Sequence, residues 1–469
     1  MLLEDMFMAI NAGARLDRLP MSAFHRRIMW LIGIGMFFDG FDIYVASTVL
    51  GATLKSGFST LPQNALFVSM TFLGMTLGAF ATGFLGDRFG RRFTYQANLM
   101  IFGLASLASA FAPNMLFLIV CRFFMGLGLG AENVVGYATM TEFVPPQARG
   151  KLQGIMAVFV VTGLPISALA GLLLVPMVGW RVMFVLGGLG AIAVWYARKQ
   201  LPESPRWLAA NGHDREADEL LNRIEAEVAA EKGPLPPPAT TVAPTFSRAF
   251  SSLFSPQIFP RLLVGCLVLI VINTLLYGFV TWLPTFFVSQ GMDIAKSFMF
   301  AFVMSLGAPI GSGIGALTAD IWGRKTVIIS ASLMAIVFGA IYPFVDQPIF
   351  LTLIGLLLVI PVYVLVALLF GIYVPELFPT EIRLRAAGIC NTFGRGATIV
   401  TPFAVVWLFG HYGITGVLAM MLSLLLLQII VVAVWGVEPK GRGLEEVAAG
   451  DARFHRDAQL THFTPPPPL

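Results

Sequence analysis

The sequence predicts an all-helical membrane protein with twelve transmembrane helices arranged as two six-helix pseudo-repeats. Three observations predict this fold class. Of the 469 residues, 57% are hydrophobic and 12% are charged, a far more apolar balance than that of soluble globular proteins. The apolar residues fall into runs of about 20, the length that an α-helix needs to cross ~30 Å of hydrocarbon. Short motifs of the first half also recur in the second half.

The twelve runs define the expected helices. They lie at 28–48, 66–86, 93–111, 115–137, 151–174, 181–198, 259–280, 297–319, 326–345, 349–371, 385–408 and 413–435. The three cysteines, Cys121, Cys266 and Cys390, all fall inside these runs. We therefore expect small packing residues rather than a framework of disulfides.

Basic residues alternate along the connections between the runs. The even-numbered connections hold Arg88, Arg91, Arg92, Arg149, Lys151, Arg198, Lys199, Arg324, Lys325, Arg383 and Arg385, whereas the odd-numbered ones hold Lys55, Arg181 and Lys296. By the positive-inside rule, we expect both termini on the cytoplasmic side. No secretory signal precedes the first run, so the first helix is expected to direct its own insertion.

These features divide the chain into five expected regions. They are a cytoplasmic N-terminal segment (1–27), an N-terminal six-helix bundle (28–200), a cytoplasmic linker with an amphipathic helix (201–258), a C-terminal six-helix bundle (259–438) and a cytoplasmic tail (439–469). Within the linker, residues 213–228 place Leu221, Ile224 and Val228 on one helical face. A proline-rich stretch from residue 234 then begins a flexible or extended connection.

Several classes of function are excluded by what the sequence lacks. It contains no catalytic metal cluster, no phosphate-binding glycine loop and no nucleophile elbow, so we expect neither an enzyme nor an ATP-driven pump, and no cofactor or metal. Its basic residues lie in short loops, which argues against a nucleic-acid partner. Gly126, Gly128 and Gly130 lie in mid-helix, where small residues permit close helix packing.

Two carboxylates interrupt the first apolar run. Asp39 and Asp42 are spaced i and i+3, so they share one face of a helix. Each costs ~2.5–3.5 kcal/mol near the bilayer centre, so this face must line a bundle interior or a water-filled path. There a carboxylate can bind a proton or hold an arginine. Proton transport and a purely structural ion pair both remain open from the spacing.

Charges in the fourth run offer partners for these carboxylates. Arg122 and Asp42 lie at similar depth from the outer ends of their helices, so an ion pair is possible. Protonation of Asp42 would break that pair and could couple proton and solute movement, although a static brace is the alternative. Glu132 is a second candidate proton site, or it stays paired and serves packing.

The repeated motifs carry a resemblance to a known family. The segment DRFGRR at 87–92 matches DIWGRK at 320–325, and EFVP at 142–145 matches ELFP at 376–379. Over twelve spans, these paired loops resemble the major facilitator superfamily along essentially the whole chain. The segment PESPRWL at 202–208 and the segment YVPELFPT at 373–380 are similar to the sugar porters and their relatives.

Departures from the sugar-porter pattern favour a resemblance to the relatives of the sugar porters, such as the metabolite–proton symporters and niacin transporters, over the sugar porters themselves. The seventh span lacks the glutamine pair that binds hexose hydroxyls in sugar porters and offers Asn273 and Tyr277 instead. The tenth span reads LFGIY at 369–373, where sugar porters usually show a tryptophan. The first span, FDGFD at 38–42, resembles the aromatic-acid–proton symporters, and the GRG at 394–396 resembles the arginine of niacin and organic-anion carriers.

This resemblance implies a secondary transporter that moves a small aromatic or heterocyclic carboxylate with a proton by alternating access. Arg395 lies roughly 15 Å deep, where a planar guanidinium flanked by glycines can hold a carboxylate, or can pair with a carboxylate of the protein. Further candidate substrate contacts are Asn273, Tyr277, Asn391 and Phe38. A sugar or polyol porter, or a receptor that moves nothing, are the alternatives.

The resemblance also implies a cytoplasmic gate and a cellular setting. The gate residues would be Asp87, Arg88, Arg91, Glu142, Asp320, Arg324, Lys325 and Glu376, with each aspartate accepting from a helix N-terminus and the basic residues pairing with the glutamates. The expected partners are substrate, proton and membrane lipid. We expect a monomer in a bacterial inner membrane.

Overall fold

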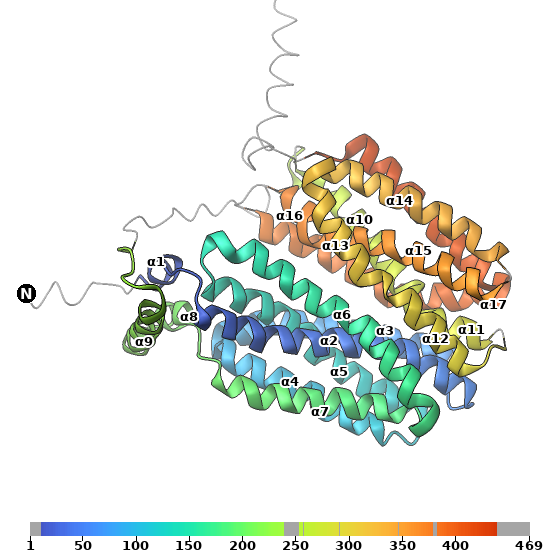
Figure 1. Cartoon of the computed structure of the whole chain (residues 1–469), viewed down its shortest axis with the longest axis horizontal. Helices are drawn as coiled ribbons and strands as arrows, with labels where there is room; N and C mark the ends of the chain where they lie inside the picture. Colours follow the sequence, from blue (N-terminus) through green and yellow to red (C-terminus); the bar gives the residue numbers. More distant parts are fainter. Residues whose placement is uncertain are drawn as a thin grey trace, which may run out of the picture. The chain divides into compact units, whose positions relative to one another are not determined.

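The computed structural model describes residues 11–238, 253–256, 258–289, 291–345, 347–378 and 382–438. The regular structure of these residues is entirely helical, so the predicted fold class is confirmed (Figure 1). The expected tail at 439–469 and the linker residues 239–252 lie outside the described residues.

The helices follow the expected order. They are α1 (Ala12–Asp17), α2 (Ala23–Lys55), α3 (Leu61–Phe89), α4 (Arg91–Ala110), α5 (Met115–Phe143), α6 (Pro146–Val178), α7 (Arg181–Ala197), α8 (Pro205–Ala210), α9 (Asp214–Lys232), α10 (Phe259–Gly278), α11 (Leu283–Ser289), α12 (Ile294–Ser305), α13 (Gly307–Trp322), α14 (Arg324–Ile341), α15 (Pro348–Leu368), α16 (Val374–Glu376) and α17 (Arg383–Trp435). A π-helical turn at Leu369–Tyr373 joins α15 to α16.

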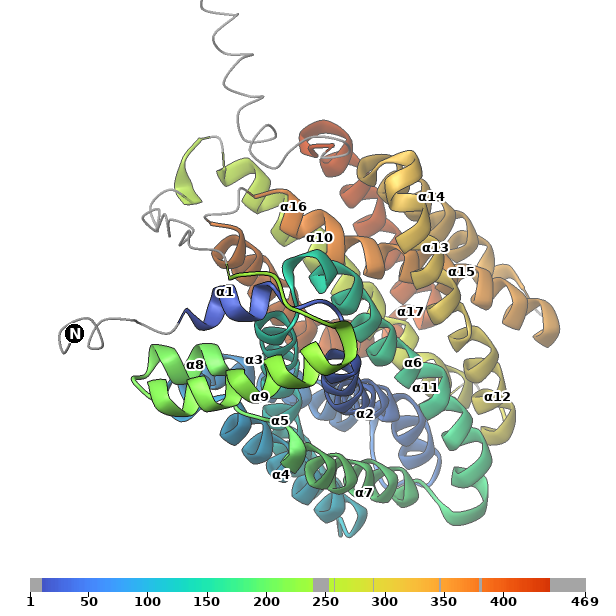
Figure 2. The ribbon, with the colours of Figure 1, turned by 60° about the vertical axis from the view of Figure 1, so that its left-hand side comes forward.

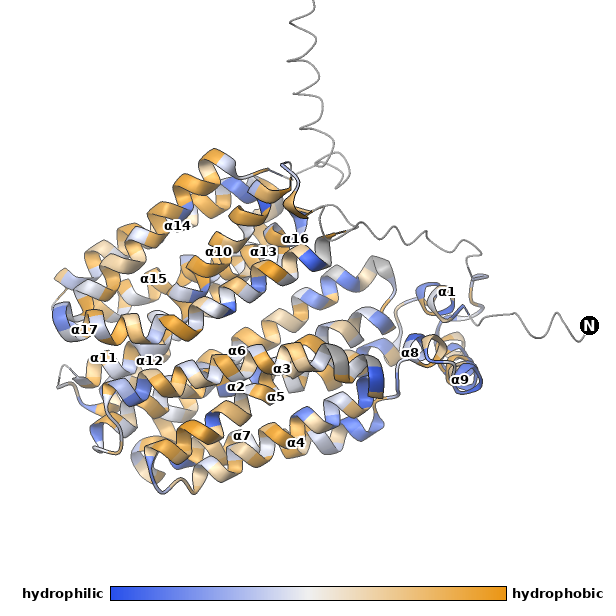
Figure 3. Ribbon diagram, turned by 180° about the vertical axis from the view of Figure 1, so that it is seen from behind, coloured by the Kyte–Doolittle hydropathy of each residue, from blue (hydrophilic) through white to orange (hydrophobic). Residues whose placement is uncertain are grey.

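Ten helical segments among the described residues are long and apolar enough to cross a membrane. The expected number is larger for two reasons. The helix α4 matches an expected span but is less apolar than the others. The last two expected spans both lie in α17, which is broken at Gly413, where φ is 62°. Hydrophobic residues dominate these long helices, and the hydrophilic ones gather on α9 and at helix ends (Figure 3).

The described chain separates into two compact units. The described residues of the first lie within 1–243, 281–305 and 402–406, and those of the second lie within 244–280, 306–401 and 407–469. The expected bundles at 28–200 and 259–438 stay a prediction, and α11, α12 and residues 402–406 of the expected second bundle group with the first unit. These two helices group with the first unit because α11 packs against α2 and α12 packs against α6.

Glycines allow a close helix crossing in the first unit between α3 and α5. A Cβ atom at Gly130 would collide with the backbone of Met75, and one at Gly78 would collide with the carbonyl oxygen of Leu127. Gly128 faces α4 instead, where a Cβ atom would lie 2.7 Å from the carbonyl oxygen of Asn98. The predicted packing role of these mid-helix glycines is confirmed.

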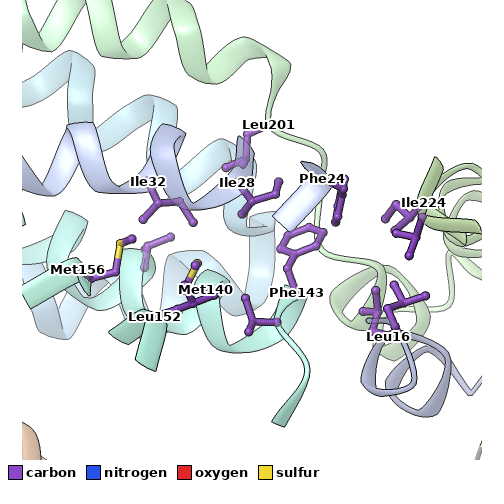
Figure 4. Close-up of a cluster of buried hydrophobic side chains, with 14 of the residues drawn as sticks. Leu16, Phe24, Ile28, Ile32, Met140, Phe143, Leu152, Met156, Leu201 and Ile224 are labelled. Atoms are coloured by element: carbon purple, nitrogen blue, oxygen red, sulfur yellow. The ribbon is translucent and has the colours of Figure 1, made fainter. Parts of the chain in front are cut away.

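The apolar face of the amphipathic helix α9 is buried against other helices of the first unit. Leu221, Ile224 and Val228 are buried in a cluster with Leu16 of α1 and Phe24 of α2 (Figure 4). The helices α1, α8 and α9 lie side by side at one end of the first unit (Figure 2). The expected helix at 213–228 is therefore present and docked within its own unit.

Ion pairs hold this docking in place. Arg15 donates from Nε to Oε1 of Glu225 at 2.9 Å and from Nη1 to Asp218 at 2.6 Å, and Arg18 donates to Glu225 at 2.8 Å. Burial alone would raise the pKa of Glu225, but the hydrogen bonds from both arginines outweigh it and lower the pKa below its ordinary value.

We expect Glu225→Gln to weaken the docking of α9 by about 1 kcal/mol at pH 7, a magnitude typical of a partly exposed ion pair. Since the folded pKa is lowered, the contribution is complete above the unfolded pKa of about 4.3 and is lost as the pH falls below it. The measurement is the rate of tryptic cleavage at Arg223 and Lys232. Glu219→Gln, which affects an exposed pair with Arg215, is the control and should change little. Equal rates for both variants at pH 7 would contradict this role of Glu225.

Candidate functional site

An ion pair joins α2 to α5 in the interior of the first unit. Arg122 donates from Nη1 to Oδ2 of Asp42 at 2.5 Å, from Nη2 to the Asp42 carbonyl oxygen at 2.8 Å, and from Nε to Thr71 at 3.0 Å. The guanidinium also lies 5.1 Å from the ring centroid of Phe67. Both charged side chains are almost fully buried, at 1% and 0% exposed. The pairing that equal depth made possible is present.

A second buried pair joins Glu132 of α5 to Arg198, which follows α7 in a short 3₁₀ turn. Arg198 donates from Nη1 to Glu132, and from Nε and Nη2 to the carbonyl oxygens of Leu31 and Ile32, each at 2.9 Å. Gly35 makes room, because a Cβ atom there would lie 2.6 Å from the guanidinium carbon. Glu132 is thus paired, which was one of its two predicted roles.

Sequence reasoning missed the site role of Arg198. The positive-inside pattern counted it as a loop charge, whereas the structure buries it against the ring of Tyr95, with 4.6 Å to the centroid. One signal was present in the sequence. Arg198 ends the apolar run at 181–198, close enough to the helix to reach back, and Glu132 lacked a candidate cation.

Asp39 is buried between these two pairs, at 1% exposed. It interacts electrostatically with Glu132, Arg198 and Asp42. Its Oδ2 has no hydrogen-bond partner among the described residues. The first unit therefore gathers three buried carboxylates around two guanidiniums.

Phe38 packs within the first unit. Its ring fills the space above Gly190 of α7, where a Cβ atom would collide with it, and forms an edge contact with Phe41. The predicted stacking of Phe38 on a substrate is not tested by this packing.

The second unit brings Arg395 together with two other predicted substrate residues. A Cβ atom at Gly394 would lie 2.8 Å from Nδ2 of Asn273, so α17 passes closely over α10 beside Arg395. Tyr277, one turn beyond Asn273, interacts electrostatically with Arg395. Asn391, one turn before Arg395, donates from Nδ2 to the Ala387 carbonyl oxygen at 2.9 Å. Arg395 is thus near Tyr277, whereas Asn273 lies against the neighbouring Gly394 and donates to the Leu269 carbonyl oxygen at 2.7 Å.

The surroundings of Arg395 differ from those of Arg122 and Arg198. Its guanidinium is half-buried, and none of the carboxylates in the described part of the chain forms an ion pair with it. The alternative of a protein carboxylate as its partner is therefore not observed among the described residues.

Each half also carries the expected pair of a loop arginine with a glutamate. Arg91 donates to Glu142 at 2.9 Å, and Arg324 donates to Glu376 at 2.9 Å. Lys325 donates to the carbonyl oxygen of Ala433 at 2.8 Å. Arg88 is exposed and lies over the ring of Phe89. The side chains of the other two predicted gate residues, Asp87 and Asp320, lie outside what the structure describes.

Two glutamates that sequence reasoning missed cap helices at these loops. Glu203 accepts from the backbone N–H of Arg91 at 2.8 Å and of Arg92 at 3.1 Å, at the start of α4. Glu438 accepts from Arg324 at 3.0 Å and Lys325 at 2.8 Å, at the start of α14. A carboxylate at a helix N-terminus satisfies free N–H groups and complements the helix dipole. Both glutamates follow the last span of their half, a repeat that the sequence contained.

The fold and these buried charges define a multi-pass membrane transporter rather than an enzyme, and comparisons with known proteins agree. The family model described as "Sugar (and other) transporter" matches residues 29–450. The chain belongs to this family of the major facilitator superfamily.

Individual relatives and solved structures cover nearly the whole chain. The inner membrane metabolite transport protein YdjE of Escherichia coli is 37% identical over 93% of this chain and 98% of its own length. The niacin transporter NiaP of Acinetobacter baylyi is 31% identical over 92% of this chain and 99% of its own. A partially occluded inward-open structure of the xylose transporter XylE from E. coli has a TM-score of 0.70 at 16% identity, over 90% of this chain and 100% of that chain.

Proposed function

We propose that this protein is a secondary active transporter that moves a small aromatic or heterocyclic carboxylate with a proton by alternating access. It would act in a bacterial inner membrane with both termini in the cytoplasm. The observation that carries the proposal is the contrast between three arginines. Arg122 and Arg198 are each neutralised by a buried carboxylate, whereas Arg395 forms no ion pair with the described residues.

An anionic substrate would supply the missing charge at Arg395. A guanidinium without a counterion is costly in a low-dielectric interior, and a carboxylate can accept two parallel hydrogen bonds from it. The tyrosine ring of Tyr277 and the amide of Asn273 lie beside it and offer stacking and polar contacts to a ring substrate. The likeness to a niacin transporter supports the same substrate class.

The buried charges of the first unit support coupling to a proton. If Asp39, Asp42 and Glu132 were all ionised, they would outnumber Arg122 and Arg198 by one negative charge. Arg122 donates a hydrogen bond to Asp42 and Arg198 donates one to Glu132, but neither donates one to Asp39. Of the three carboxylates, Asp39 therefore loses the fewest favourable contacts when it binds a proton. A proton on Asp39 and a substrate anion at Arg395 would cross the membrane together without net charge.

We expect Arg395→Ala to lower uptake of the anion about 10- to 100-fold, the loss of ~1.5–3 kcal/mol that a charge-assisted hydrogen-bonded contact provides. The measurement is uptake of radiolabelled nicotinate and hydroxybenzoate into proteoliposomes with an inward proton gradient. Arg395→Lys keeps the charge without the two-pronged geometry, so it should retain an intermediate rate. Gradient-independent uptake of glucose or xylose that Arg395→Ala leaves unchanged would instead support a sugar facilitator.

We expect Asp39→Asn to abolish accumulation of the anion against its gradient while exchange of labelled for unlabelled substrate continues. The asparagine resembles a permanently protonated aspartate, so the substrate path stays usable but no longer depends on a proton. Gradient-driven accumulation and counterflow, measured on the same proteoliposomes, separate the two. Accumulation that survives in Asp39→Asn would exclude Asp39 as the proton carrier.

A sugar or polyol porter is the second candidate. The family description names sugar transport, and the fold is that of a xylose transporter. The uptake assays with glucose and xylose decide between the two candidates.

A further inference from the structure

Two cysteine side chains from different helices of the second unit lie in contact. Sγ of Cys266 in α10 is 3.8 Å from Sγ of Cys390 in α17. Both are free thiols in this structure, as is the buried Cys121 of the first unit. The sequence predicted packing residues at all three positions, and the contact of two thiols across helices is a feature that this expectation did not include.

The contact is part of the close packing of α10 on α17 between Gly265 and Thr274 on one side and Cys390 and Thr401 on the other, called the seam below. A Cβ atom at Gly265 would lie 2.7 Å from Sγ of Cys390, so only a glycine leaves room for that sulfur. Farther along, Gly394 packs on Leu269, where a Cβ atom would lie 3.1 Å from the carbonyl oxygen. The hydroxyls of Thr274 and Thr401 then lie 3.3 Å apart. The seam therefore holds the two sulfurs on backbones that already pack closely.

The two sulfurs are already in van der Waals contact. The S–S bond is about 2.0 Å long, so the sulfurs must approach by roughly 1.8 Å, a shift that rotation of two cysteine side chains can supply. Cys390 is fully buried, whereas Cys266 is partly exposed. Cys266 also lines an apolar cavity of about 960 Å³ with Leu263, Phe393 and Trp435. A small neutral oxidant can therefore reach the Cys266 sulfur, whereas the Cys390 sulfur is buried behind Cys266.

We propose that Cys266 and Cys390 form an oxidisable dithiol that a hydroperoxide converts into a disulfide between α10 and α17. The Cys266 sulfur attacks one peroxide oxygen, the O–O bond breaks, and a sulfenic acid and one water are formed. The Cys390 sulfur then attacks the Cys266 sulfur, and the sulfenic hydroxyl leaves with the Cys390 proton as a second water. Two thiols are oxidised and one hydrogen peroxide is reduced to two waters.

The disulfide would restrain the helix pair that carries the substrate group. Cys266 lies about two turns before Asn273 on α10, and Cys390 lies just over one turn before Arg395 on α17. A covalent bond at this level fixes the separation of the two helices beside the guanidinium. Oxidation is therefore expected to slow transport, a consequence that rests on the proposed function, whereas formation of the bond does not.

The experiment uses the full chain with Cys121→Ser, which leaves only the two seam cysteines, reconstituted in proteoliposomes. Hydrogen peroxide is added, the protein is denatured, remaining thiols are alkylated with N-ethylmaleimide, and the intact mass is measured. We expect both adducts to be lost together and to return after dithiothreitol. In Cys266→Ser and Cys390→Ser, the remaining thiol should not form an intramolecular bond. Nicotinate uptake before and after oxidation is measured on the same vesicles.

Each outcome decides the proposal. Paired loss of adducts, reversed by dithiothreitol, supports the dithiol whether or not any solute is transported. Two thiols that stay fully alkylated, or that are lost one at a time as sulfinic acids, would overturn it. If the disulfide forms and the uptake rate is unchanged, the inferred restraint on transport is wrong. If hydrogen peroxide also lowers uptake by the Cys390→Ser variant, which cannot form the disulfide, the inferred restraint on transport is wrong as well.

Discussion

Replacing Arg122 with leucine is expected to destabilise the first unit by about 3–5 kcal/mol. The change removes a guanidinium that gives three hydrogen bonds, two of them to Asp42, and leaves that carboxylate buried without a counterion. The cost of an unpaired buried charge greatly exceeds the net contribution of the pair itself. We expect the thermal unfolding midpoint in detergent, followed by tryptophan fluorescence, to fall sharply.

The control for this prediction is the double variant Asp42→Asn/Arg122→Leu. It removes the charge from both partners, so no ionised group is left buried, and most of the lost stability should return. A double variant as unstable as Arg122→Leu alone would mean that Arg122 stabilises the fold through its contacts with Thr71 and Phe67 rather than through Asp42.

Gly130→Ala is expected to destabilise the first unit by about 3 kcal/mol or more, at the upper end for overpacked sites. The obstacle to the new methyl group is the backbone of Met75 on the facing helix, so no side chain can rotate to relieve the clash. The helices α3 and α5 would have to separate along their whole contact, including the loss of packing at Gly78. The same unfolding measurement applies.

The same substitution at Gly154 is the matched control. This glycine lies in α6 and is exposed, and an added methyl carbon would meet no atom of another residue within 4 Å among the described residues. Since alanine favours a helix over glycine by about 1 kcal/mol, Gly154→Ala should leave stability unchanged or slightly raise it. Similar losses at both positions would show that helix packing is not the reason for Gly130.

Features that depend on local pattern were predicted correctly from the sequence. The apolar runs predicted the spans, and α2, α5 and α15 each contain the expected segment or most of it. The two repeated loops predicted the family, because a motif that recurs at corresponding places is a one-dimensional signal. The glycines of α5 were correctly interpreted as packing positions, since their mid-helix location already excluded a phosphate loop.

Features that depend on how helices meet were predicted only in part. Equal depth made the pair of Asp42 and Arg122 possible, but depth says nothing about which face of a helix a residue occupies. The pair of Glu132 and Arg198 joins residues 66 positions apart, and the loop position of Arg198 concealed it. The flanking glycines of Arg395 and the depth of Arg122 hinted at different roles, but which of the two arginines forms an ion pair depends on which carboxylates the folded chain brings near.

The glutamate caps at the starts of α4 and α14 show which features the two halves share. Glu203 and Glu438 make the same bonds in both halves, so the cap belongs to the internal repeat of the chain. The buried acids Asp39, Asp42 and Glu132 have no such twin, since the corresponding spans of the second half, 259–280 and 349–371, contain no aspartate or glutamate. The helix caps therefore occur in both halves, whereas the buried acids of these spans occur only in the first half. A repeat that keeps its helix caps but not its buried acids can support different tasks in its two halves.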